Sequence, residues 1–260
     1  MVKNTSGVTG LNSCLARGRP YRGRVATLTL NTSQRAARST VALKALMAVS
    51  GIVLVLYLLA HMYGNLKVFA GQAAFDEYAH HLRTIGEPVL PHTGLLWVIR
   101  VVLVVAVVAH AYAAFKLWAR NHRGRGGARR YHAPRAARGV QRSYSSFTLR
   151  WGGIIIALFV VLHLLNFTWG VVHPGGASDS PYQRVVNGFG VWWVVVAYTV
   201  AMIAVGFHLR HGMWSALTTL GANTGAVARR RLNLLAYAVA GVITVGFLLP
   251  PYSILLGLVS

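Results

Sequence analysis

The chain has 260 residues, of which 55% are hydrophobic and only 12% are charged. Its mean hydropathy of +0.51 excludes an ordinary soluble domain, because so much apolar surface needs lipid around it. The excess of 26 Lys and Arg over 4 Asp and Glu would suggest nucleic-acid binding in a soluble protein. Here the basic residues lie in blocks between apolar runs, which is typical of membrane proteins. We therefore expect a lipid bilayer, and no nucleic acid, as a partner.

The cysteine content limits the cofactor chemistry. Cys14 is the only cysteine, so intrachain disulfides, cysteine-ligated iron–sulfur clusters and a CxxCH haem attachment are excluded. Any haem in this chain would be held non-covalently.

Residues 1–40 are rich in Arg, Ser and Thr and have no apolar core. They are predicted to be a basic, disordered or peripheral tail without a cleaved signal peptide. Residues 41–260 are predicted to be one transmembrane domain. Its apolar stretches lie near 43–66, 94–117, 150–172, 190–213 and 232–256, and each is long enough to cross a bilayer as a helix of about 20 residues. The predicted fold class is an all-α membrane protein, a bundle of five transmembrane helices.

The charges predict how this bundle is oriented. Eight Lys or Arg residues lie in 1–44, ten in 116–150 and four in 210–231, with no acid in any of these segments. All four acidic residues lie in the other two segments, 67–93 and 171–189. Because cytoplasmic loops collect Lys and Arg, the sequence predicts an N-in, C-out topology.

Five of the eleven histidines lie within the apolar stretches: His61, His110, His163, His208 and His211. A single buried histidine is usually structural, but five at membrane depth indicate function. The direction of each helix brings His61 and His163 together near the outer side, and His110 together with His208 or His211 near the inner side. Two such pairs, stacked along the membrane normal, are what two bis-histidine haems b require. The spacing of His208 and His211, about one turn, leaves the choice between them open.

Small residues recur at a fixed distance from the outer pair. Ser50 and Gly152 each precede an outer histidine by eleven residues, which is about three turns, so they lie on the ligand's face roughly 16 Å further toward the cytoplasm. We expect the inner haem to fit against them. The alternative is ordinary close packing of membrane helices.

Four segments carry a resemblance to a known family: LLAHMYGNL, AHAYAAFKLW, VLHLLNF and HLRHGMWSALTTLG. Between about residues 43 and 220 the chain resembles the single-chain dihaem cytochrome b subunits of succinate dehydrogenases and fumarate reductases. The family has a His-Gly pair on its fourth helix, which matches His211 and Gly212. The resemblance therefore favours His211 over His208 as the partner of His110.

The resemblance implies a membrane-anchor subunit of a succinate:quinone oxidoreductase in the bacterial inner membrane. Its partners would be an FAD-containing flavoprotein and an iron–sulfur subunit on the cytoplasmic face. Electrons from succinate would pass through the inner and outer haems to a quinone, with menaquinone as the expected acceptor. This subunit would supply haem and quinone binding but no substrate chemistry of its own.

The chain departs from some fumarate reductases at one position. Those members have a glutamate two residues before the fourth-helix histidine, where this chain has Leu209. No acidic residue lies in any predicted helix, so a carboxylate proton relay cannot be built from this chain alone. Electron transfer between the haems would then move uncompensated charge, worth about 2.3 kcal/mol per 100 mV, which favours reduction of menaquinone.

Other polar and aromatic residues are candidates for the cofactor sites. Arg100 is expected near outer-haem propionates or a quinone carbonyl, or else snorkels to the headgroups. Arg210, Ser215 and Thr218 are expected to bind the inner-haem propionates. Alternatively, Arg210 only marks the cytoplasmic end of the helix. Flanking aromatic residues are Tyr57, Trp169, Trp192 and Trp193, with an interfacial belt as the alternative for the tryptophans.

The first outer loop contains candidates for protonating a quinone. These candidates are His80, His81, Glu87 and His92. The predicted quinone site consists of two of them, Glu87 and His92, together with Arg100. Solvated loop residues are the alternative interpretation.

Two other functions fit parts of the pattern. A dihaem cytochrome b of a formate dehydrogenase or hydrogenase would have the same ligands but a different soluble partner, and co-purification distinguishes it. A cofactor-free transporter usually has broken helices or internal repeats, and neither is found in this sequence.

Overall fold

The computed structural model describes residues 39–123 and 140–260, with the side chains of 140–148 excepted. In these ranges the secondary structure is helical throughout, and the elements are α2 (Thr40–Leu66), η1 (Lys67–Ala70), α3 (Gln72–Thr84), α4 (Gly94–Arg123), α5 (Val140–His163), η3 (Leu164–Thr168), α6 (Pro181–Phe189), α7 (Trp192–Thr219) and α8 (Ala226–Leu255). Five of them are long and apolar enough to cross a membrane, which confirms the predicted five-helix, all-α fold. The prediction of a tail at residues 1–40 lies almost entirely outside the described residues.

The predicted helix ends were wrong in two ways. Helices α4 and α7 continue to Arg123 and Thr219, beyond the apolar runs. The backbone hydrogen bonds of a helix do not depend on apolar side chains, so the helix can extend past the membrane into the polar interface. The third helix was predicted to extend to residue 172 but ends at His163 and continues as one π-helical turn, η3. The chain then leaves the helix at Gly170, whose φ of 59° suits glycine.

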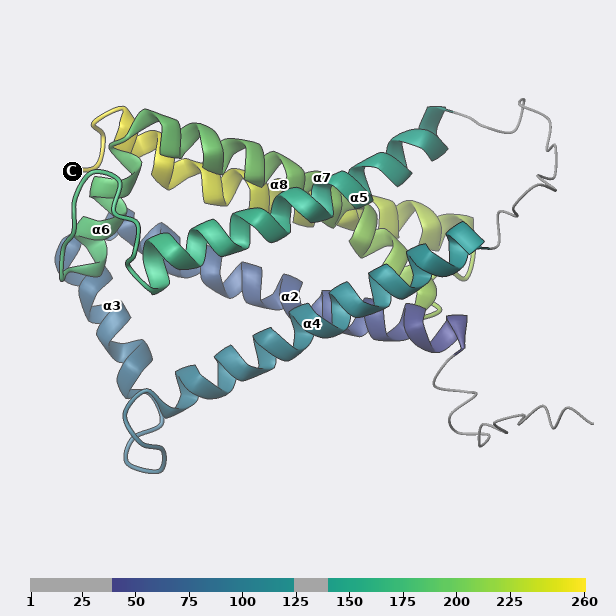
Figure 1. The fold of residues 1–260 in the computed structure, drawn as a ribbon, viewed down its shortest axis with the longest axis horizontal. Coiled ribbons are helices and arrows are strands. Elements are labelled where there is room, and N and C mark those ends of the chain that lie inside the picture. The colour runs from purple at the N-terminus through teal and green to yellow at the C-terminus, as the bar shows by residue number, and fades with distance from the viewer. Residues whose placement is uncertain (1–38, 124–139) are drawn as a thin grey trace, which may run out of the picture.

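Two short helices, α3 and α6, were not predicted from the sequence. They lie at the end of the bundle that also holds the C-terminus, which we call the capped end (Figure 1). The opposite end, where α2 and α8 begin and α4 and α7 end, we call the basic end (Figure 1). Gly175, in the loop before α6, faces the backbone of Asn187 so closely that a Cβ at this position would clash with it.

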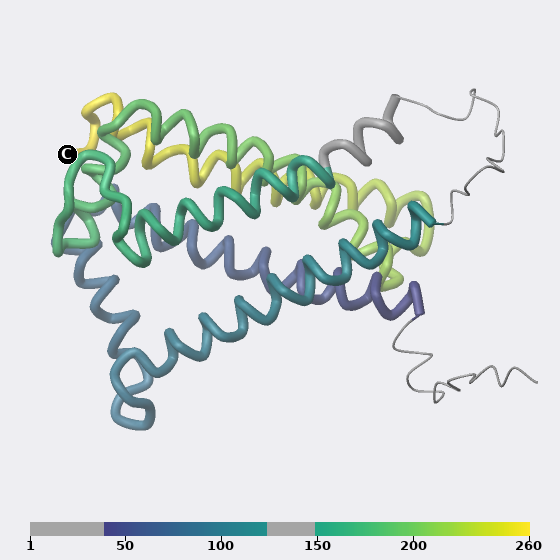
Figure 2. Tube along the Cα trace, viewed as in Figure 1, coloured from purple at the N-terminus to yellow at the C-terminus, as the bar shows by residue number. Residues whose placement is uncertain are grey.

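Helix α7 is at the centre of the bundle. It packs against α8, α5 and α2, and α2 in turn packs against α4; α7 and α8 run side by side (Figure 2). The main core lies between α2, α7 and α8 and includes Val55, Met202, Val205 and Ile243. Helix α4 is peripheral, and its large apolar side chains are mostly exposed, as expected of a helix that contacts lipid.

Asp76 connects the two helices of the capped end. Its carboxylate accepts hydrogen bonds from the Ser180 hydroxyl at 2.6 Å and from the Tyr182 backbone amide at 3.0 Å. Both donors are at the N-terminus of α6, whose positive end favours an anion. Burial raises the pKa of Asp76, but the hydrogen bonds from Ser180, Tyr182 and further polar neighbours outweigh it, and the pKa lies below its ordinary value.

We predict that Asp76→Asn loosens the contact between α3 and α6 at neutral pH. The loss is expected to be about 1 kcal/mol, because a partly exposed hydrogen bond to a charged group is weakened by solvent. A group with a lowered pKa stabilises the fold above its ordinary pKa, and this stability is lost as the pH falls through the lowered pKa. The difference between the variant and the unmodified protein should therefore disappear in acid. Thermal unfolding in detergent as a function of pH measures it.

The control is Glu77→Gln, which removes the neighbouring exposed carboxylate from the same helix. An equal effect of both substitutions, or a difference for Asp76→Asn that persists in acid, would contradict the role of Asp76.

Candidate functional site

The first histidine pair lies toward the capped end. His61 near the end of α2 and His163 at the end of α5 have ring centres 5.7 Å apart, in an edge-to-face arrangement. The Tyr57 ring stacks on His61 at 5.3 Å, and Phe247 of α8 contacts the same imidazole at 5.7 Å. Helices α2 and α5 thus bring together the two residues predicted as outer ligands.

His163 has a polar neighbour on helix α7. Its Nδ1 lies 3.3 Å from the hydroxyl of Tyr198, whose side chain is only 6% exposed. The sequence analysis did not identify Tyr198, because nothing in the spacing of an isolated tyrosine 35 residues downstream indicates this contact.

The second pair lies toward the basic end and joins α4 to α7. The rings of His110 and His208 have centres 6.1 Å apart. His110 Nδ1 lies 3.1 Å from the backbone carbonyl of Met47 and 3.4 Å from the Ser50 hydroxyl, both on α2. A carbonyl can only accept, so this ring carries a proton on Nδ1 and keeps Nε2 free, which is the tautomer found in metal-binding histidines.

The ring that faces His110 belongs to His208, whereas the resemblance favoured His211. Nδ1 of His208 is buried and has no hydrogen-bond partner within the described part of the chain. His211 lies one turn closer to the basic end and is less deeply buried. The ring contact with His110 thus involves His208, and His211 as the ligand stays a prediction.

Small residues lie beside both rings of the second pair. A Cβ added to Gly51 would be 3.4 Å from the His110 ring, and one added to Gly153 would be 3.9 Å from the His208 ring. Ser50, one of the two predicted residues, is buried and contacts His110 directly. The other predicted residue, Gly152, instead faces the backbone of α7 at Ala204.

The ring centres in each pair are about as far apart as those of two imidazoles bound to opposite sides of one metal. A metal–imidazole bond of about 2 Å on each side of the metal places two ring centres roughly 6 Å apart, close to the separations of 5.7 and 6.1 Å. The neighbouring glycines and the unpartnered nitrogen of His208 also suit a planar ligand at the second pair. The described residues contain no group of three or more His, Cys, Asp or Glu side chains that could hold a metal, so ligation by protein side chains alone would involve two residues at a time.

Of the polar candidates near the basic end, Arg210 has protein partners on α8. Arg210 donates to Asn233 at 3.3 Å and to the Tyr237 hydroxyl at 2.9 Å, and its guanidinium lies over the Tyr237 ring. It therefore links α7 to α8. Thr218 has a buried hydroxyl without a hydrogen-bond partner in the described ranges, and Ser215 is half-buried.

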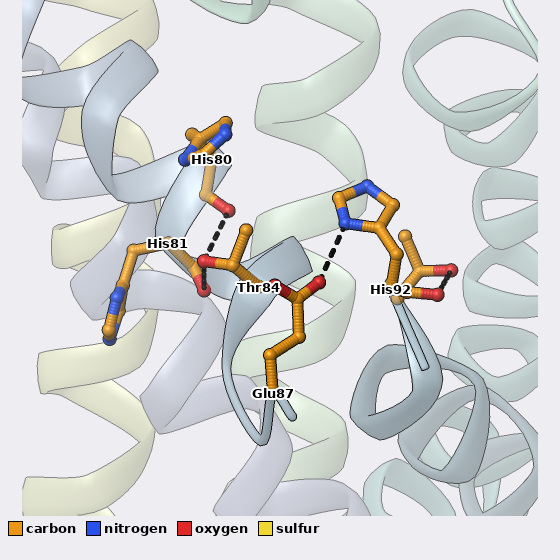
Figure 3. A network of polar contacts seen from close by, with 6 residues as sticks. His80, His81, Thr84, Glu87 and His92 are labelled. Carbon is orange, nitrogen blue, oxygen red and sulfur yellow. Dashed lines mark hydrogen bonds and ion pairs between the residues drawn. The ribbon is translucent and has the colours of Figure 1, made fainter. Parts of the chain in front are cut away.

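The predicted quinone residues lie in the loop before α4 and in the first turns of that helix. His92 Nδ1 and the Glu87 carboxylate are 3.0 Å apart in the loop before α4, and both side chains are largely exposed (Figure 3). In the same view Thr84 bonds the backbone carbonyls of His80 and His81 (Figure 3). Arg100 lies within α4, over the ring of Trp97 at 5.1 Å.

The tryptophans predicted to flank a haem or form a belt are exposed. Trp169, Trp192 and Trp193 have exposed fractions of 63%, 68% and 46% and lie near the capped ends of α5 and α7. Among the aromatic candidates, only Tyr57 contacts a membrane histidine.

Comparison with known proteins gives one result. No curated protein and no solved structure matches the chain. A model of the succinate dehydrogenase/fumarate reductase transmembrane subunit family matches residues 128–248, which include the second half of the bundle with His163, His208 and His211. Residues 128–248 are thus similar to the succinate dehydrogenase/fumarate reductase transmembrane subunit family, and the five apolar helices agree with a membrane subunit.

Proposed function

We propose that this chain is the dihaem cytochrome b anchor of a succinate:quinone oxidoreductase in a bacterial inner membrane. The observation that carries the proposal is the presence of two facing histidine pairs at different depths of a bundle whose second half is similar to the transmembrane subunits of such enzymes. The family match also favours this function over a transporter or a subunit of a formate dehydrogenase or hydrogenase.

In this proposal His61 and His163 hold the outer haem, and His110 and His208 hold the inner haem. When bound, haem b supplies a one-electron centre at its iron. The protein orients the ligands: the Met47 carbonyl and the Ser50 hydroxyl fix the His110 ring, and packing by Tyr57 fixes the His61 ring. Because His211 is the ligand that the resemblance favours, it is the alternative to His208.

The distribution of charge supports an orientation with the basic end in the cytoplasm. Twenty-two of the 26 basic residues are in segments 1–44, 116–150 and 210–231, and all four acids are in the segments of the capped end. The flavoprotein and the iron–sulfur subunit would then bind at the basic end. Reporter fusions test this: positions 130 and 225 should be cytoplasmic and positions 85 and 180 external, and an external signal at 130 would reverse the assignment of inner and outer haem.

The five spanning helices contain no Asp or Glu. A carboxylate relay that compensates electron transfer with protons therefore has no residue in this chain. Transfer of each electron from the inner to the outer haem would move uncompensated charge, worth about 2.3 kcal/mol per 100 mV of membrane potential. Because this can help to drive the reduction of a low-potential quinone, we propose menaquinone as the acceptor. Arg100, Glu87 and His92 are the proposed contacts for it on the outer side.

The direct test is to isolate the complex and assay its pigment. We expect two haems b per chain, reduced by succinate, in a complex that contains an FAD-bearing subunit. A ratio of one or zero haems would reject the dihaem site. A complex that contains haem but no flavoprotein would instead favour another membrane oxidoreductase.

A second prediction concerns the two candidate ligands on α7. If His208 is the ligand, His208→Ala should remove the inner haem or make it high-spin, because the ring that faces His110 is lost. His211→Ala should then keep both low-spin spectra. The reverse result would assign His211, as the family pattern favours, and would leave the two-pair arrangement intact. If both single variants kept two low-spin haems, the pairing of α4 with α7 would be wrong.

A further inference from the structure

The ring of Tyr198 packs among phenylalanine side chains, whereas its hydroxyl contacts a histidine. The ring forms edge-to-face contacts with Phe159 at 4.8 Å, Phe189 at 5.0 Å and Phe167 at 6.1 Å. The side chain is only 6% exposed. Such packing fixes the direction in which the hydroxyl points, because the ring cannot rotate away without separating these contacts.

The hydroxyl of Tyr198 is directed at the outer histidine pair. It lies 3.3 Å from Nδ1 of His163, and the side chain of Asn166 lies near it. Asn166 is buried and belongs to the π-helical turn that follows His163. Single π-helical turns occur frequently at functional sites, and this one brings a polar side chain next to the hydroxyl.

Packing alone does not require this hydroxyl. A phenylalanine would fill the same aromatic cluster without bringing a polar group into the membrane, where a buried hydroxyl without a partner is costly. When Nε2 of a histidine binds a metal, Nδ1 carries the proton and donates it to a neighbouring acceptor. The hydroxyl oxygen of Tyr198 is such an acceptor.

We propose that Tyr198 is a positioning residue for the outer haem: it accepts the Nδ1 proton of His163, holds the imidazole in its ligating tautomer and lowers the reduction potential of that haem. The inference rests on the proposed function, since it assumes that His163 is a ligand. An acceptor at Nδ1 raises the basicity of the imidazole, and a more basic ligand stabilises ferric iron relative to ferrous iron. The inner histidine His110 has the backbone carbonyl of Met47 as its nearer acceptor at 3.1 Å, with the Ser50 hydroxyl at 3.4 Å, whereas the hydroxyl of Tyr198 is the acceptor at His163.

The test is a redox titration of the isolated complex with Tyr198→Phe. We expect two haems per chain, with the outer haem, identified as the one lost in His163→Ala, shifted to higher potential. A tenfold loss of ferric stabilisation is the expected size, which is about 59 mV for a one-electron couple. The inner haem should keep its potential and serves as the internal reference. Selective loss of the outer haem in Tyr198→Phe would also support the proposal, because an imidazole that is not held in place ligates poorly.

The matched control is Tyr182→Phe. Tyr182 is buried in the same hydrophobic cluster as Tyr198, but its hydroxyl donates to the backbone of Ser260 at 3.1 Å and contacts no histidine. The control should leave both potentials unchanged. The inference is overturned if Tyr198→Phe leaves the outer potential unchanged, lowers it, shifts both haems equally or does no more than Tyr182→Phe. Absence of haem from the unmodified protein would overturn the proposed function, and that outcome is visible before any variant is made.

Discussion

The arrangement of this protein depends on the cost of placing imidazoles at membrane depth. Lipid offers no hydrogen bonds, so a polar ring in a spanning helix must find its partners within the bundle. His163 and His110 do so through Nδ1, with the Tyr198 hydroxyl and the Met47 carbonyl. Because both contacts use Nδ1, Nε2 of each ring is left without that partner. A second histidine ring lies close to each of them, His61 beside His163 and His208 beside His110.

The two central helices each serve both pairs. Helix α2 contributes His61 to the first pair and, through Met47 and Ser50, contacts His110 of the second pair. Helix α7 contributes His208 to the second pair and, through Tyr198, contacts His163 of the first pair. The peripheral helices α4 and α5 contribute one histidine each. Because α2 and α7 pack directly on one another, the two pairs are linked by the same two helices.

The sequence predicted the coarse architecture well, because lipid imposes strong rules on composition and charge. Long apolar runs were sufficient to predict five helices, and the direction of each helix was sufficient to predict which histidines lie at the same end of the bundle. The features that were missed depend on the rotation of helices and on side-chain contacts. The packing of α5 and α7 determines that the His208 ring faces His110 and that Gly153 rather than Gly152 lies beside His208, whereas the prediction of His211 as the ligand stays open. Likewise, α3 and α6 are short and polar, and their mutual contact through Asp76 depends on residues about a hundred positions apart.

The central claim is that four helices hold two haems by two separate histidine pairs, and electron paramagnetic resonance of the oxidised complex tests it most directly. The unmodified protein should give two low-spin ferric signals. His61→Ala and the double variant His61→Ala with His163→Ala should both lose the same single signal, because those residues share one haem, whereas His61→Ala combined with His110→Ala should lose both. Loss of both signals when only His61 and His163 are replaced, with the protein still inserted in the membrane, would contradict the pairing.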